Sequence, residues 1–161
     1  MSETQIILFV LVVFPLFFTA MWLGITGLLA EVGGWRELAR VYREPEGMVR
    51  APVQSFPMAT LDLRRGRFPL PTNYSNCMIV EIAQAGLHLR PWRPFRFRHP
   101  PLLIPWSQIE GIEPGYVLFF RILKITPRGV QTRIRMYGAA ANAVEQVWQQ
   151  LAARAAQPVP V

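Results

Sequence analysis

The chain of 161 residues carries 17 Lys and Arg against 10 Asp and Glu, and 52% of its residues are hydrophobic. This length leaves room for one domain together with a membrane anchor or a helical appendage. The single cysteine excludes an internal disulfide, and we expect Cys77 to be buried and inert because it begins an apolar strand-like run.

The first predicted element is an apolar helix near the N-terminus. From Ile6 to Ala30 the sequence has no charged residue and is apolar around the whole helical circumference, which disfavours a core helix of a soluble protein. A helix of that length spans a hydrocarbon core of about 30 Å. The alternative is a cleaved signal peptide, but the leading MSETQ has no basic region and the apolar stretch is too long. We therefore predict a transmembrane anchor at residues 1–31, with Ala20 and Gly24 spaced for packing against a second helix.

The charge distribution predicts the orientation of this anchor. Every Lys and Arg follows the apolar segment, beginning at Arg36. The positive-inside rule then predicts a single-pass protein of the inner (cytoplasmic) membrane, with its N-terminus outside and its C-terminal domain in the cytoplasm.

Residues 32–57 are predicted to form a short amphipathic helix and a linker rich in Pro and Gly. The helix has aromatic residues on one face and arginines on another, which fits a position among lipid headgroups. A frayed continuation of the anchor is the alternative, although Gly33 and Gly34 favour a break. The residues assigned to this membrane interface are Trp35, Arg36, Arg40, Tyr42 and Arg43.

Residues 58–157 contain short strand-like runs separated by turn signals such as EGIEPG and TPRG. The run AAANAVEQVWQQLAARAA then has one apolar helical stripe. Five to seven antiparallel strands closed by a C-terminal amphipathic helix predict a mainly-β small barrel or sandwich.

One stretch of this domain alternates aromatic and basic residues. Phe95 and Phe97 alternate with Arg96 and Arg98, which predicts a strand with an aromatic face and a cationic face. With the preceding Trp92 and Arg93, this ribbon fits an anionic lipid surface. The alternative is a hairpin with phenylalanines in the core and solvated arginines, and the alternation alone does not decide between the two. The following HPPLLIPWSQI is predicted to be an edge strand that its prolines protect from pairing.

The stretches GWRELARVYR and GLHLRPWRPFRFRHPPLLIPWSQI are similar to a family of uncharacterised bacterial proteins that have an N-terminal membrane anchor. The strand-rich domain with one capping helix resembles the pleckstrin-homology-like (PH-like) and GRAM-like group. The resemblance implies a PH-like fold and an anchoring mode, but no activity. In PH domains that bind phosphoinositides, the basic residues lie between the first two strands, where this chain has Arg64, Arg65 and Arg67.

Motifs of catalysis and cofactor binding are not apparent in the sequence. His88 and His99 have no second ligand at metal spacing, and the chain has no phosphate-binding glycine loop or nucleophile elbow. We therefore predict no metal, no cofactor and no enzymatic activity. An enzyme with an assembled carboxylate site, such as Glu81 with Glu110 or Glu113, is a third alternative.

The sequence favours a non-enzymatic, membrane-anchored binding or assembly module that docks as an accessory subunit to a larger membrane complex. The alternative is a sensor of anionic lipid headgroups. Nucleic acid is a disfavoured partner, because a tethered domain meets lipid phosphate first and no nucleic-acid module is visible. The candidate residues for binding lipid or a partner protein are Arg64, Arg65, Arg67, Trp92, Arg93, Arg96 and Arg98.

Overall fold

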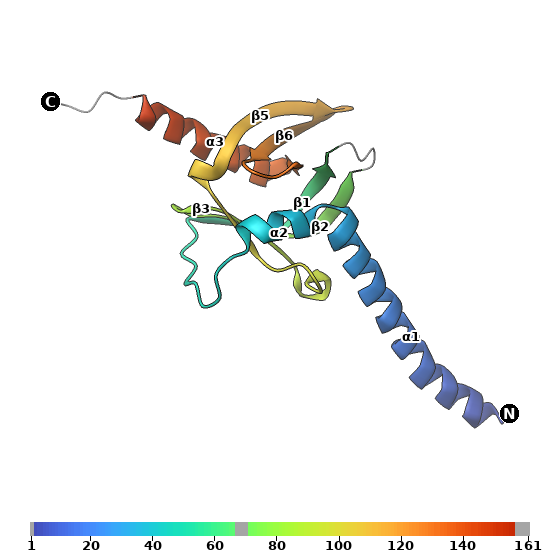
Figure 1. Ribbon diagram of the computed structural model, residues 1–161. Helices are drawn as coiled ribbons and strands as arrows, with labels where there is room; N and C mark the ends of the chain where they lie inside the picture. The colour runs from blue at the N-terminus through green and yellow to red at the C-terminus, as the bar shows by residue number, and fades with distance from the viewer. Residues whose placement is uncertain (1, 67–70, 157–161) are drawn as a thin grey trace.

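The computed structural model describes residues 2–66 and 71–156, and it combines a long N-terminal helix with a curled sheet (Figure 1). Helix α1 (Glu3–Val32) is followed by the short helix α2 (Trp35–Tyr42), and helix α3 (Gly138–Ala155) ends the described chain. Between them lies an antiparallel half-barrel of seven strands. The predicted mainly-β domain with a C-terminal helix is confirmed at this level.

The strands occur in the order β4-β3-β2-β1-β7-β6-β5, so that β1 joins the two halves of the sheet by pairing with both β2 and β7. Two short 3₁₀ turns, Arg93–Phe95 and Trp106–Gln108, flank β4 in the sequence. The strand bounds are β1 (Gln54–Arg65), β2 (Thr72–Ile82), β3 (Gly86–Pro91), β4 (Leu102–Pro105), β5 (Ile109–Val117), β6 (Phe120–Pro127) and β7 (Thr132–Tyr137).

The hydrophobic core lies between the inner face of the sheet and the two shorter helices. Leu61 and Leu63 of β1 are fully buried there, because alternate residues of a strand point to the same face. Helix α3 contributes Val144, and helix α2 contributes Trp35 and Leu38. One continuous core therefore connects residues from both sides of the predicted boundary at residue 58, and β1 itself begins before that boundary.

Helix α1 is long and apolar enough to cross a membrane. The most apolar 18-residue window has a mean hydropathy of 2.7, and none of it is buried against the rest of the protein. The buried residues of the helix, Thr26, Gly27 and Ala30, all lie in its last third, where it meets the domain. The predicted break at Gly33 and Gly34 is confirmed, since α1 ends just before these glycines and α2 begins just after them.

The expected position of α2 among lipid headgroups is wrong for its aromatic residues. Trp35 is 0% exposed and donates a hydrogen bond from Nε1 to the carbonyl of Pro100 at 3.1 Å. Tyr42 is also buried, and its hydroxyl donates to the carbonyl of Arg128. An amphipathic helix shows the same spacing whether it covers lipid or protein. Here the apolar face of α2 covers the open half-barrel.

The expected strand at Phe95–Arg98 is also wrong. The 3₁₀ turn begins at Arg93, and Arg98 has a left-handed backbone with φ of 58°. Pro94 lies inside that turn, where its ring fixes φ and removes a backbone donor that a strand would need. Local proline geometry therefore overrides the period-two pattern.

The predicted edge strand is confirmed at β4, which ends the sheet order. The segment after α2 covers part of this edge, with a bridge between Arg43 and Leu102. The backbone N–H of Glu44 also donates to the carbonyl of Pro101 at 2.9 Å. This arrangement agrees with an edge that is protected from further pairing.

Candidate membrane-proximal surface and basic groove

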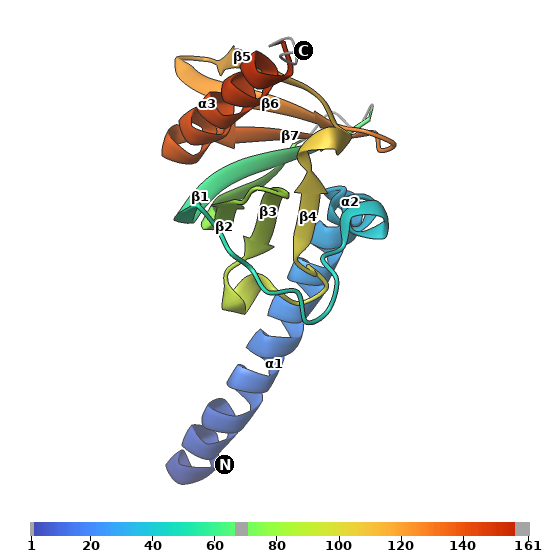
Figure 2. The same ribbon diagram turned by 90° about the vertical axis from the view of Figure 1, so that its left-hand side faces the viewer.

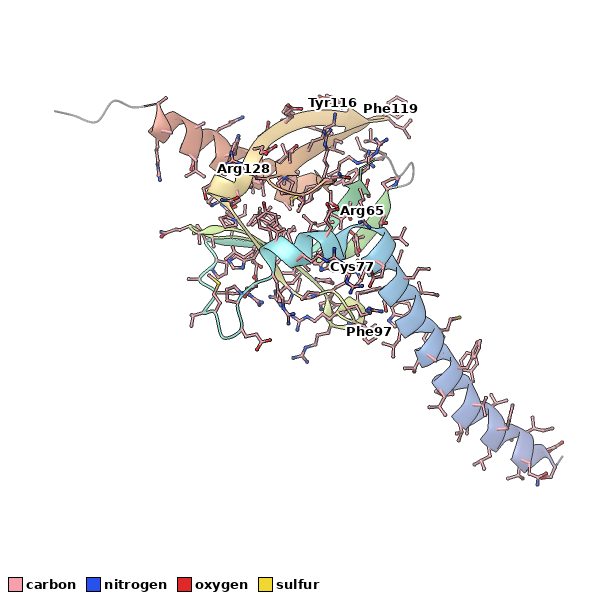
Figure 3. All side chains as sticks on the ribbon, in the orientation of Figure 1. Arg65, Cys77, Phe97, Tyr116, Phe119 and Arg128 are labelled. Atoms are coloured by element: carbon pink, nitrogen blue, oxygen red, sulfur yellow. The ribbon has the colours of Figure 1, made fainter. Side chains whose placement is uncertain are left out.

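The loop of residues 92–98 packs against α1 between Trp22 and Gly27. Trp22 donates a hydrogen bond from Nε1 to the carbonyl of Pro94 at 3.0 Å, and its ring lies 5.2 Å from that of Phe95. Gly27 faces the side chain of Arg98 so closely that a Cβ atom there would lie 3.2 Å from Arg98 Cδ. Figure 3 shows Phe97 of this loop beside α1. These contacts fix the position of the 92–98 loop along the axis of α1.

The 92–98 loop presents both apolar and cationic side chains to its surroundings. Trp92 is 59% exposed and Phe97 is 44% exposed. Among the described residues, Arg93 and Arg96 form no ion pair. Desolvation lowers the pKa of Arg96, and the nearby charges of three other arginines lower it further. This part of the surface is thus cationic without enough counter-charge.

A hollow of about 380 Å³ lies where the end of α1, helix α2 and the 92–98 loop meet. Glu31 is its carboxylate, and this residue pairs with Arg98 at 3.1 Å and also with Arg36. The structure thus brings the arginines of α2 predicted for the membrane interface together with one arginine of the 92–98 loop. The hollow is lined by Arg36, Arg40, Arg43 and Arg98, together with Ala30, Glu31, Ala39 and Pro100.

The corner between α1 and α2 is fixed by close contacts with the sheet. Gly34 has φ of 88°, a conformation that favours glycine, and a Cβ atom there would collide with Thr132 of β7. A Cβ atom on Gly33 would lie 2.7 Å from the hydroxyl oxygen of Thr72 of β2. Glu37 accepts hydrogen bonds from the Thr132 hydroxyl at 2.7 Å and from the backbone N–H of Gln131 at 2.8 Å. Helix α1 and the domain are therefore joined rigidly.

Arg64 and Arg65, two of the three arginines predicted to form a cluster between the first two strands, lie on opposite faces of the sheet. Arg65 points toward the helices, where its Nε lies 3.4 Å from Glu37 and its Nη1 donates to the carbonyl of Glu31. Arg64 lines a groove that Arg65 does not, because neighbouring residues of a strand face opposite sides. Arg67 lies outside the described residues. The structure therefore does not bring Arg64 and Arg65 into one site.

A basic groove of about 850 Å³ lies along β1, β7, β6 and β5. Its carboxylates, Glu110 and Glu113, both come from β5. Sequence reasoning missed this groove, although the alternating arginines of VQTRIRMYG were a signal for one cationic strand face. The cations that line the groove are Arg64, Lys124, Arg133 and Arg135.

Arg135 is held at the groove by a buried carboxylate on the neighbouring strand. Asp62 accepts hydrogen bonds from Asn73 at 2.5 Å and from the Tyr137 hydroxyl at 2.6 Å, and it lies 3.2 Å from Arg135 Nη2. Burial and the nearby Asp62 charge raise the pKa of Tyr137 to about 12, so this hydroxyl remains a proton donor. Two hydrogen bonds thus fix the Asp62 carboxylate, and its ion pair with Arg135 orients that arginine.

The carboxylates considered for an assembled enzymatic site lie on different strands. Glu81 on β2 pairs with Arg90 at 2.8 Å, whereas Glu110 on β5 lies 3.8 Å from Arg128. Glu113 lines the basic groove with Glu110, and Glu81 does not. Across residues 2–66 and 71–156, no group of three His, Cys, Asp or Glu side chains is placed to hold a metal ion.

The two histidines and the cysteine are buried inside the domain. His88 is buried with Nδ1 3.4 Å from Glu44, and His99 is buried with Nε2 3.0 Å from the Tyr74 hydroxyl. Burial lowers the pKa of His99 and raises that of the Cys77 thiol. The predicted burial of Cys77 is confirmed.

Helix α1 and one hairpin both leave apolar surface uncovered. Ala20 is exposed, and apart from its chain neighbours and the nearby backbone of its own helix, no atom lies within 4 Å of the position that a Cβ atom on Gly24 would occupy. At the far end of the domain, the tip of the β5–β6 hairpin carries exposed large side chains (Figure 3). These side chains are Tyr116, Leu118, Phe119 and Phe120, and we call them the hairpin tip.

Comparison with known protein families and with curated proteins finds no match to this chain.

Proposed function

We propose that the protein is a single-pass membrane protein whose PH-like cytoplasmic domain is a docking module held on the membrane surface. The observation that carries this proposal is the junction of α1 with the domain. There an uncovered apolar helix meets a rigid corner surrounded by exposed aromatic and cationic side chains. This combination is typical of the boundary between hydrocarbon and water.

The length of α1 supports this assignment. Its 30 residues extend about 45 Å, whereas about 20 residues cross a hydrocarbon core. Crossing from the N-terminal end therefore leaves the last third of α1 at the headgroups and in the domain. Trp22 and the 92–98 loop then lie at the interface, where Trp is favoured and each arginine near an anionic leaflet contributes about 1 kcal/mol.

The packing of α1 favours a retained anchor over a cleaved signal sequence. Thr26, Gly27 and Ala30 are buried against the domain, and Trp22 is hydrogen-bonded to it. Cleavage after these residues would remove part of the folded structure. The charge asymmetry supports a cytoplasmic domain, since every Lys and Arg follows α1.

The PH-like assignment rests on architecture. A seven-stranded antiparallel half-barrel with one C-terminal helix is the arrangement that the sequence resemblance implies. No catalytic constellation supports an enzyme in the described residues, so binding is the function that the geometry supports best.

One experiment tests both the anchor and its orientation. Single cysteines are placed by Ser2→Cys, before α1, and by Leu118→Cys, at the hairpin tip, in a Cys77→Ser background. We expect an impermeant thiol reagent to label the first variant in intact cells and the second only after permeabilisation. Carbonate extraction should leave both variants in the membrane fraction. Recovery of the protein as a soluble species, or the reverse labelling pattern, would contradict the proposal.

A second candidate function is the sensing of anionic lipid headgroups, and the hollow beside α1 favours it. Four arginines and one carboxylate line this hollow, which lies at the level of the lipid headgroups under the proposed insertion of α1. Mass spectrometry of the purified full-length protein tests this by measuring retained anionic lipid. We expect Arg40→Gln together with Arg43→Gln to reduce retention, and the matched control Arg154→Gln on α3 to leave it unchanged. Equal retention in all three proteins would argue against a headgroup site.

A further inference from the structure

The basic groove holds cations whose charges are not compensated. Arg64 and Arg133 lie directly opposite each other on β1 and β7, an arrangement of like charges that destabilises a sheet. Within the described residues, neither they nor Lys124 form an ion pair. Such a pair is retained at a cost in stability unless an anionic group binds between the two guanidinium groups.

The carboxylates of the groove do not neutralise it. Glu110 lies 3.8 Å from Arg128, outside the groove lining, and Glu113 is the cross-strand neighbour of Lys124. Arg135 is bound by Asp62 on one side, but its buried Nε has no partner among the described residues. With Arg135 paired to Asp62, the other three cations of the groove, Arg64, Lys124 and Arg133, face the carboxylates of Glu110 and Glu113.

The hairpin tip continues the groove with apolar surface. Tyr116 belongs to both, because it lines the groove and also projects from the hairpin. Leu118 and Phe119 connect the paired residues Val117 and Phe120 and are 84% and 95% exposed. Leu118 also has φ of 55°, at a hairpin position where Gly or Asn is usual. Large apolar side chains in a strained and exposed turn indicate a binding role rather than a stabilising one.

The position of the hairpin tip decides which kind of occupant fits. In Figures 1 and 2, β5 and β6 lie on the side of the domain away from the N-terminus of α1. The bilayer that α1 enters under the proposed function is therefore out of reach of this surface. A small phosphorylated ligand would leave the hairpin tip uncovered. A protein segment with both carboxylates and apolar side chains matches the whole surface.

We infer that the basic groove and the hairpin tip together bind an acidic segment of a partner protein, with its carboxylates between Arg64 and Arg133 and its apolar side chains on Phe119. The inference rests on the proposed function, because the orientation of α1 places this surface toward the cytoplasm. It adds the chemistry of the partner and the residues that recognise it.

The test uses the full-length protein in the membranes of the cells that make it. A photo-crosslinking phenylalanine analogue replaces Phe119, and mass spectrometry identifies the crosslinked peptide. We expect one protein segment that is rich in Asp, Glu and apolar residues. Arg64→Glu with Arg133→Glu should reduce the crosslink by about tenfold or more, since charge reversal places like charges in contact. The matched control Arg154→Glu should leave the yield unchanged.

Several outcomes would overturn the inference. These are crosslinks to lipid, to a second copy of the chain or to a segment without acidic residues, and a yield that charge reversal leaves unaltered. Arg133→Gln repeats the measurement without a new negative charge and should reduce the yield in the same direction, and thermal unfolding of each variant checks that it is folded. Carbonate extraction of every variant separates the two proposals, because loss of membrane retention refutes the anchor, whereas normal retention with no acidic crosslink refutes this inference alone.

Discussion

Replacement of Trp35 by Ala tests whether α2 belongs to the core of the domain or to the membrane surface. The Trp35 side chain is fully buried, and a Trp side chain buries about 150–250 Å². At about 25 cal/mol per Å², its removal costs roughly 4–6 kcal/mol of transfer free energy. The hydrogen bond to Pro100 adds about 1 kcal/mol. Measured losses for buried Trp→Ala substitutions are about 3–5 kcal/mol, a large part of the stability of an ordinary domain.

The assay is chemical unfolding of the full-length protein in mild detergent, and the circular dichroism signal of the sheet is used to monitor the unfolding. Trp92→Ala is the matched control, because Trp92 is 59% exposed and makes no comparable contribution to the core. We expect Trp35→Ala to lower the free energy of unfolding by at least about 3 kcal/mol and Trp92→Ala by less than about 1 kcal/mol. Equal and small losses in both variants would refute the burial of α2 in the core.

Three further predictions concern other buried contacts. Because burial lowers the pKa of His99, the unfolded chain binds a proton that the folded one excludes, so stability should fall as pH drops below about 6.5. His99→Gln should reduce the difference between unfolding measured at pH 7.5 and at pH 5. Gly34→Ala should lower the melting temperature more than Gly129→Ala, because both have positive φ but only Gly34 also lacks space for a Cβ atom. Asp62→Asn should cost about 3–5 kcal/mol in chemical unfolding, since it leaves the mostly buried Arg135 without a counter-ion, and a loss under 1 kcal/mol would contradict this.

Much of the fold followed from patterns that depend on nearby residues. The apolar run of α1, the break at Gly33 and Gly34, the strand-rich domain and the helical stripe of α3 all appear in the sequence as local periodicity. The position of α2 could not be predicted from such local periodicity, because its apolar face matches a lipid surface and an open half-barrel equally well. At Pro94 the alternating pattern does not predict the turn, because the backbone restriction of proline outweighs the alternation of the neighbouring side chains.

The candidate sites were harder to predict from the sequence than the fold, because they depend on the pleat and the register of the strands. Arg64 and Arg65 are neighbours in the chain, but the pleat of β1 sends them to opposite faces. Arg64 and Arg133 are distant in the chain, but strand register places them opposite each other. Residue spacing alone contains no information on register between β1 and β7, so the groove became visible only with the topology.

The contacts of the corner between α1 and α2 have a consequence for biosynthesis. Gly34 packs against Thr132, which the ribosome adds roughly 5–20 s later at a rate of about 5–20 residues per second. During that interval Trp35 and Tyr42 have no half-barrel to cover. If α1 enters a bilayer as it emerges, the nearest apolar surface for α2 is the membrane itself. Under the proposed insertion, α2 would contact the membrane first, and it can cover the core only when β7 is complete.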